Sequence, residues 1–62
     1  MERRAAIAAL PHPYAVALRL HDAGATADAI ACALDIDPAG VPMVLRIGRE
    51  KLDSLLESSD AR

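Results

Sequence analysis

A single stripe of apolar residues constrains the fold more than any other feature of this chain. From Val41 onward, apolar positions recur at intervals of three and four residues, which is the spacing of one face of an α-helix. The stripe comprises Val41, Val44, Leu45, Gly48, Leu52, Leu55 and Leu56. Charged residues such as Arg46, Glu50 and Asp53 occupy the opposite side. A helix with one long apolar face must bury it, so the rest of the 62-residue chain has to supply the covering elements.

Three shorter helical segments precede this stripe, and no segment has the alternation of a strand. They are predicted at about residues 2–10, from near Pro13 to Gly24, and from Thr26 to Asp35. Prolines cannot continue a helix interior, glycine accepts the left-handed conformation that ends a helix, and threonine is a good N-cap. The sequence therefore predicts an all-α fold, a small bundle of three to four helices. Residues 1–57 form the predicted domain, and residues 58–62 form a frayed or disordered tail.

The start of the last helix allows two arrangements. Asp37 can cap a helix whose first residue is Pro38, but Pro42 would then lie inside its first turns. Proline there lacks an N–H, and it disfavours the α conformation of Val41 before it. Either residues 38–41 form a separate turn, or a regular helix begins only near Pro42.

The predicted core is thin, because alanine is the commonest apolar residue and Tyr14 is the only aromatic one. Cys32 is expected to be a small packing residue between two alanines. Gly48 costs helix propensity, and a close approach of the third helix is the expected reason for it. We predict that Ile30, Leu34 and Ile36 pack against Val41, Leu45 and Leu52, with Val16, Leu18 and Leu20 as a third wall.

Composition and spacing argue against several classes of function. The net charge of −2 does not attract a polyanion, so a nucleic-acid surface would have to be local. The single cysteine excludes an internal disulfide and suits the cytoplasm. No apolar run approaches the roughly 20 residues of a membrane span, and no signal-peptide pattern is present. His12 and His21 lack partners at metal-ligand spacing. Without a nucleophile–base pair or a phosphate-cradling loop, we expect no enzyme, cofactor or small-molecule substrate.

The segment from Gly24 to Ile36, followed by Val41, Leu45 and Lys51-Leu52, resembles two related families. These are region 4 of bacterial sigma factors and the LuxR-type DNA-binding domain. The resemblance extends without a gap from Ala9 to Leu55 and implies a helix-turn-helix. It further implies that residues 26–34 brace against the backbone of double-stranded DNA while residues 40–51 approach the major groove. The implied DNA-binding residues are Thr26, Gly40, Met43, Arg46, Arg49 and Lys51.

Several positions depart from the family pattern. Asp35 stands where glycine is usual, Ala29 where an acid is usual, and Gly40 where a phosphate-contacting threonine is frequent. Positions that face the groove in these families carry basic or polar side chains, whereas here they are Pro42, Met43, Val44 and Ile47. The scaffold thus resembles that of a DNA-binding domain, while the surface that would face the major groove is largely apolar.

Two functions therefore remain open. The first is a small transcription-associated module that binds DNA weakly or with the help of a partner. The second is a protein-interaction module that keeps the scaffold but has lost DNA reading, with a regulator or a second copy as its partner. The predicted partner-binding residues are Pro42, Met43, Ile47, Leu55 and Leu56, and in LuxR-type domains the last helix supplies a homodimer seam.

For the charged residues, a solvent-exposed position without a role in binding is the alternative interpretation. Arg46, Arg49 and Lys51 could equally form a solvated helix face, in which Arg46–Glu50 and Arg49–Asp53 are pairs at i,i+4 spacing. Arg3 and Arg4 are either a phosphate-binding arm or, as we favour, a solvated terminus. His21 is expected to be a surface residue near a helix end.

Overall fold

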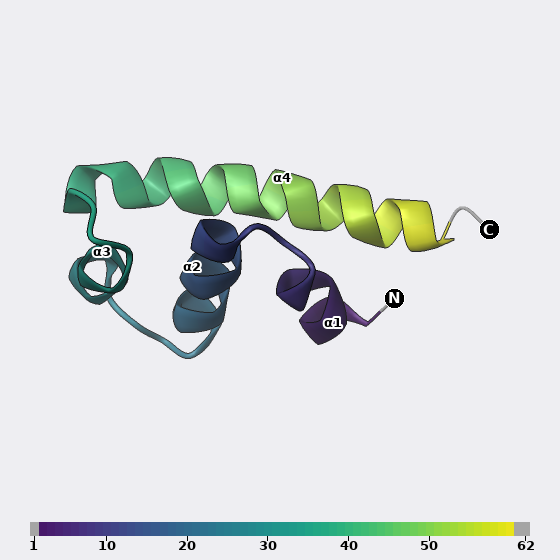
Figure 1. Ribbon diagram of the computed structural model, residues 1–62, viewed down its shortest axis with the longest axis horizontal. Coiled ribbons are helices and arrows are strands. Elements are labelled where there is room, and N and C mark those ends of the chain that lie inside the picture. Colours follow the sequence, from purple (N-terminus) through teal and green to yellow (C-terminus); the bar gives the residue numbers. More distant parts are fainter. Residues whose placement is uncertain (1, 61–62) are drawn as a thin grey trace.

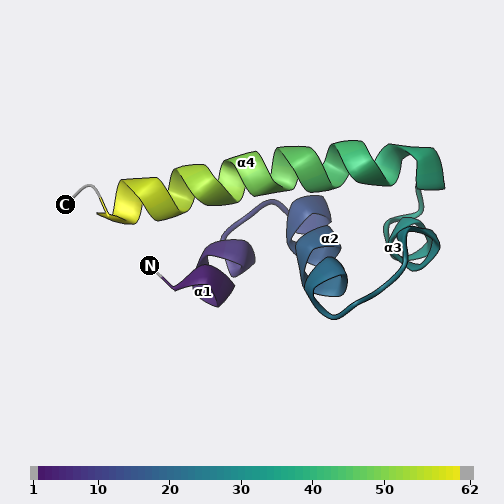
Figure 2. The same cartoon turned by 180° about the vertical axis from the view of Figure 1, so that it is seen from behind.

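One long helix spans the molecule, and three short helices pack along one side of it (Figures 1 and 2). The computed structural model describes residues 2–60, with side chains through residue 57. Its elements are α1 (Arg3–Ala8), α2 (His12–Asp22), α3 (Ala27–Leu34), a 3₁₀ turn η1 (Pro38–Gly40) and α4 (Val41–Asp60). The predicted all-α bundle is confirmed. Helical backbone continues to Asp60, into the segment predicted as a tail, and residues 61–62 lie outside the described residues.

Left-handed residues end α2 and α3 in the same way. Gly24 has φ +88°, and the N–H of Ala25 donates to the Leu20 carbonyl at 2.9 Å. Asp35 has φ 58°, and the N–H of Ile36 donates to the Ala31 carbonyl at 3.0 Å. Both are Schellman motifs, in which backbone N–H groups satisfy carbonyls left over at the helix end. Asp35 does this with a Cβ that the left-handed conformation disfavours.

Asp35→Gly should raise the unfolding temperature. Glycine adopts the left-handed conformation without a steric penalty, and part of that gain is offset by the larger entropy of the unfolded chain. We expect a net gain of about 0.5 kcal/mol, or a few degrees in a domain of this size. Thermal denaturation followed by circular dichroism measures it. Gly24→Ala is the converse control and should destabilise the protein, because it places a Cβ at a left-handed position. A lower melting temperature for Asp35→Gly than for the wild type would contradict the left-handed conformation of Asp35.

The chain enters α4 through a separate turn, as the first of the two predicted arrangements requires. Asp37 caps η1, with its Oδ1 accepting a hydrogen bond from the Ala39 N–H at 2.9 Å. α4 then begins at Val41, so Pro42 is its second residue. Proline is tolerated there because the first N–H groups of a helix have no intrahelical acceptor.

The core consists of two clusters that α4 joins. One lies between α1, α2 and α4, and the other between α2, α3 and α4, with Leu45 packed against both. The first, which we call the α1 cluster, contains Ala6, Ile7, Leu10, Ala15, Leu18 and Leu52. The second contains Ala17, Ile30, Ala31 and Val41.

Four predictions about packing were wrong. Leu52 belongs to the α1 cluster rather than packing with Ile30. A Cβ on Gly48 would meet Leu18 and Tyr14 of α2 at 3.4 Å, so the helix that approaches it is α2, not α3. Cys32 is exposed, because α3 buries only the face that carries Ile30 and Ala31. Ile36 is 38% exposed, since it follows the left-handed turn that leads the chain away from α3.

Candidate nucleic-acid interface

α3, η1 and the first half of α4 are the elements to which the resemblance assigns a helix-turn-helix. Thr26 caps α3, its Oγ1 accepting a hydrogen bond from the Ala29 N–H at 3.1 Å. Val41, at the start of α4, is buried with Ile30 and Ala31 of α3, and this contact fixes the two helices against each other. The exposed Thr26 and the start of α4 therefore belong to one rigid unit.

The outer face of this unit at the start of α4 is apolar. Pro42 and Met43 are exposed, and Met43 has 57% of its surface accessible. Gly40 is half-buried, with the Ile36 side chain 3.9 Å from the position that its Cβ would take. The structure thus leaves Met43 on the surface, where the resemblance places a base-contacting residue, but gives it no hydrogen-bonding group.

Arg46 and Arg49 lie on one flank of α4, beside the beginning of α3. Both line a surface depression, which we call the α2–α4 hollow. Ala25, which precedes α3, and Ala27, the first residue of α3, line it as well. Ile30, Val41 and Leu45 also line it, and the remaining residues are His21, Pro42, Glu50 and Asp53. This places two predicted DNA-binding cations beside the N-terminus of α3, whose free N–H groups favour anions.

His21 is a member of this site that the sequence analysis assigned only to the surface. Nη2 of Arg49 lies 3.0 Å from Nε2 of His21. A guanidinium can only donate, so Nε2 of His21 is the acceptor in this contact. Tyr14, Leu18 and His21 follow an i, i+4, i+7 spacing on α2, and that spacing was the available signal that His21 faces α4.

Lys51 lies on the other flank of α4. Its Nζ is 5.7 Å from the centroid of the Tyr14 ring, a cation–π arrangement. Tyr14 and His21 occupy the two ends of the face of α2 that crosses beneath Gly48. The three predicted cations therefore do not converge: Arg46 and Arg49 share the α2–α4 hollow, and Lys51 does not line it.

Acidic side chains limit the positive charge of the α2–α4 hollow. Glu50 and Asp53 line it alongside the two arginines. Neither predicted i,i+4 pair, Arg46–Glu50 or Arg49–Asp53, forms within 4 Å among residues 2–57. Neither arginine is thus held by a carboxylate in the described part of the chain, although Arg49 contacts His21, and the two acidic side chains offset the two positive charges of the hollow.

The ion pair that the described side chains do form joins α1 to α2. Both terminal nitrogens of the Arg3 guanidinium donate to the Asp22 carboxylate. These hydrogen bonds hold the pKa of Asp22 below its ordinary value of 3.8 and raise the pKa of Arg3. Because both side chains are substantially exposed, at 52% and 39%, water screens the pair.

Asp22→Asn should lower the stability slightly at neutral pH. The pKa of Asp22 is lower in the folded than in the unfolded protein, so the pair stabilises the fold above the ordinary carboxyl pKa and this stabilisation is lost as pH falls through the folded value. We expect a difference of a few tenths of a kcal/mol at pH 7 that disappears once the pH is below the lowered, folded-state pKa of Asp22. Thermal melts from pH 7 to pH 2.5 measure it, with Glu57→Gln as the charge-matched control. A difference that persists at the lowest pH would rule out the ion pair as its source.

The apolar residues predicted to bind a partner are only partly available. Ile47 is half-buried, and Leu55 and Leu56 are half-buried against the α1 cluster. α1 therefore covers part of the surface that the resemblance assigns to a homodimer seam. Of the predicted partner-binding residues, Pro42 and Met43 are the exposed ones.

Comparisons of the chain with protein-family models, curated proteins and solved structures give no match. Within the described residues, no three histidine, cysteine or carboxylate side chains are grouped so that they could hold a metal ion. None of the described helices combines the length and the apolar character that crossing a membrane requires.

Proposed function

We propose that this protein is a small helix-turn-helix module of the transcription apparatus that contacts duplex DNA weakly. Arg46 and Arg49 bind backbone phosphates in this proposal, and Met43 lies nearest the base edges. Useful affinity comes from a second copy or a larger complex, because linking binding units adds effective concentration without new contacts.

One observation carries the proposal. Arg46 and Arg49 line the same hollow as Ala25 and Ala27, which flank and begin α3 beside its Thr26 cap. Two guanidinium groups and the N–H groups at a helix start are both donors that suit phosphate oxygens. The buried contact between Val41 and α3 packs together the two helices that carry these donors.

The same geometry supports weak and largely sequence-neutral binding. Backbone affinity grows with the number of phosphates neutralised, and the α2–α4 hollow offers two arginines against two carboxylates. Base discrimination in the major groove requires hydrogen-bonding side chains. Pro42 and Met43 supply none, so only contact with a thymine methyl is left to them.

Fluorescence anisotropy of a labelled generic duplex, titrated with the purified protein at several salt concentrations, tests the proposal. Each neutralised phosphate contributes about −0.9 to the slope of log affinity against log salt. With Arg46 and Arg49 on one flank and Lys51 on the other, we expect a slope of about −2. Absence of binding at 20–50 mM salt would overturn direct DNA contact by the isolated chain.

A protein-interaction module is the second candidate, and the exposure of Met43 at 57% beside the exposed Pro42 favours it. Met43→Arg separates the two, because this exposed position accepts a charge without disturbing the core. A DNA module should bind duplex more tightly, with a slope steeper by about 1. An interaction module should instead lose self-association, measured by sedimentation equilibrium, with no gain in DNA affinity.

A further inference from the structure

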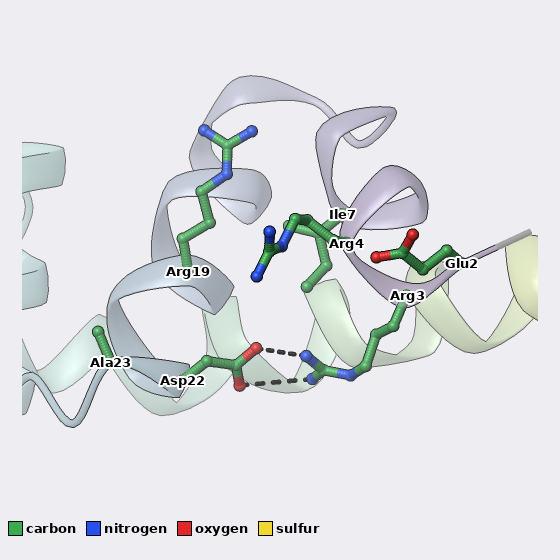
Figure 3. Close-up of a pocket in the computed structure, with 7 residues that line it drawn as sticks. All are labelled: Glu2, Arg3, Arg4, Ile7, Arg19, Asp22 and Ala23. Carbon is green, nitrogen blue, oxygen red and sulfur yellow. Dashed lines mark hydrogen bonds and ion pairs between the residues drawn. The ribbon is translucent and has the colours of Figure 1, made fainter.

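Arginines from two helices gather on the surface of α1 and α2 that faces away from α4. Arg3, Arg4 and Arg19 line a hollow with Asp22, and Glu2, Ile7 and Ala23 complete it. In Figure 3, α4 passes behind α1 and α2, and Arg4 extends from α1 toward α2, from which Arg19 projects. We call this the α1–α2 hollow; it shares no lining residue with the α2–α4 hollow.

The arginines differ in how their charge is compensated. Arg3 is tied to Asp22 by two hydrogen bonds (Figure 3). For Arg4 and Arg19, no carboxylate of residues 2–57 lies within ion-pair range. Both also line a second hollow, beside Ala5 and Ala8 of α1. Glu2 lines both hollows and is the one acid there not already paired.

The packing of α1 on α2 brings these charges together. Ile7 of α1 and Leu10, in the turn that follows α1, are buried with Ala15 and Leu18 of α2. Arg4 and Arg19 are therefore carried by packed helices rather than by a free terminus, although both side chains are exposed. Arg4 and Arg19 line the same hollow, and an oxyanion bound there would offset their like charges while accepting charge-assisted hydrogen bonds from both.

We propose that the α1–α2 hollow binds a phosphate group, with Arg4 and Arg19 as its direct ligands and the Arg3–Asp22 pair positioning α1 against α2. The hollow is open to solvent and has a volume of about 470 Å³, which leaves room for a phosphate with its hydration water. Arginine rather than lysine at both positions suits bidentate recognition of tetrahedral oxyanions. The phosphate can be free or can belong to a nucleic-acid backbone, and this proposal does not depend on DNA binding by α4.

The test is a titration of ¹⁵N-labelled protein with sodium phosphate, compared with sodium chloride at matched ionic strength. Phosphate should produce saturable shifts of the Arg4 and Arg19 amides that chloride does not. Arg4→Ala/Arg19→Ala should weaken phosphate binding about tenfold or more, because it removes two charge-assisted donors. Arg46→Ala/Arg49→Ala should leave it unchanged. Equal shifts in chloride, or undiminished binding by Arg4→Ala/Arg19→Ala, would overturn the proposal.

Two further variants guard against loss of fold. Arg4→Lys/Arg19→Lys preserves the charge but removes the planar fork, and its phosphate affinity should lie between those of the wild type and the alanine variant. Glu2→Gln should tighten phosphate binding by removing the unpaired acid.

Binding of a short duplex then identifies the source of the phosphate. Weaker duplex binding by Arg4→Ala/Arg19→Ala assigns the nucleic-acid backbone, and unchanged duplex binding assigns a free phosphate. If α4 does not bind DNA, Arg46→Ala/Arg49→Ala will have the same duplex affinity as the wild type. That result counts against the proposed function and leaves the phosphate site untouched.

Discussion

Arg46→Ala/Arg49→Ala should lose duplex binding by about tenfold or more at low salt. Both guanidinium groups line the α2–α4 hollow beside the start of α3, and no other arginine among residues 2–57 lines it. Removing two phosphate contacts should also flatten the salt dependence, from a slope of about −2 toward zero. Anisotropy titrations with the duplex used for the wild type measure both quantities. The loss should be uniform across sequences, because phosphate contacts carry no direct base information.

Lys51→Glu is the matched control for this experiment. Each of the two variants changes the formal charge by −2, from −2 to −4, so any general electrostatic effect is equal. Lys51 lies over Tyr14 on the other flank of α4, and its replacement should reduce binding less than the arginine variant does. Equal losses in the two variants would show that net charge alone governs binding and that the α2–α4 hollow is not the site.

Leu18→Ala should remove a large part of the free energy of unfolding at 25 °C. Leu18 is 1% exposed, belongs to the α1 cluster and also packs under Gly48 of α4. Truncating a buried leucine costs about 2–5 kcal/mol, because apolar contacts are lost and a cavity remains. A domain of 62 residues has a total stability of only about 3–9 kcal/mol, so one substitution removes much of it. Urea and thermal denaturation followed by circular dichroism measure the change.

Met43→Ala is the control for Leu18→Ala. It removes a side chain of similar size from an exposed position, and the change in unfolding free energy should stay within about 0.5 kcal/mol. A Leu18→Ala protein that melts within a few degrees of the wild type would show that α2 is not the centre of the core. Because α2 contributes residues to both clusters, that result would also call into question the way α2 packs against α4, and with it the contacts that His21 and Tyr14 make with α4.

Local signals in the sequence predicted the helices and most of their ends. Thr26 caps α3, Gly24 takes the left-handed conformation after α2, and Asp37 caps the separate turn before α4. These features were predictable because each depends on hydrogen bonds and backbone preferences within a few residues. The apolar period of α4 likewise identified the buried Val41 and Leu52. The assignment to a DNA-binding family, by contrast, stays a prediction.

The sequence by itself determined the all-α class, the helix ends and the side of α4 that is buried, because these follow from local hydrogen bonding and the period of the helix. Only the tertiary structure decided which helix covers each part of that side. The crossing of α2 beneath Gly48 directs His21 to Arg49 on one flank and Tyr14 to Lys51 on the other, which separates cations only two residues apart. The packing of α1 on α2 likewise brings Arg4 to Arg19. Periodicity says which residues share a face, but how two helices cross depends on side chains far apart in the chain, so these groupings exist only in the folded protein.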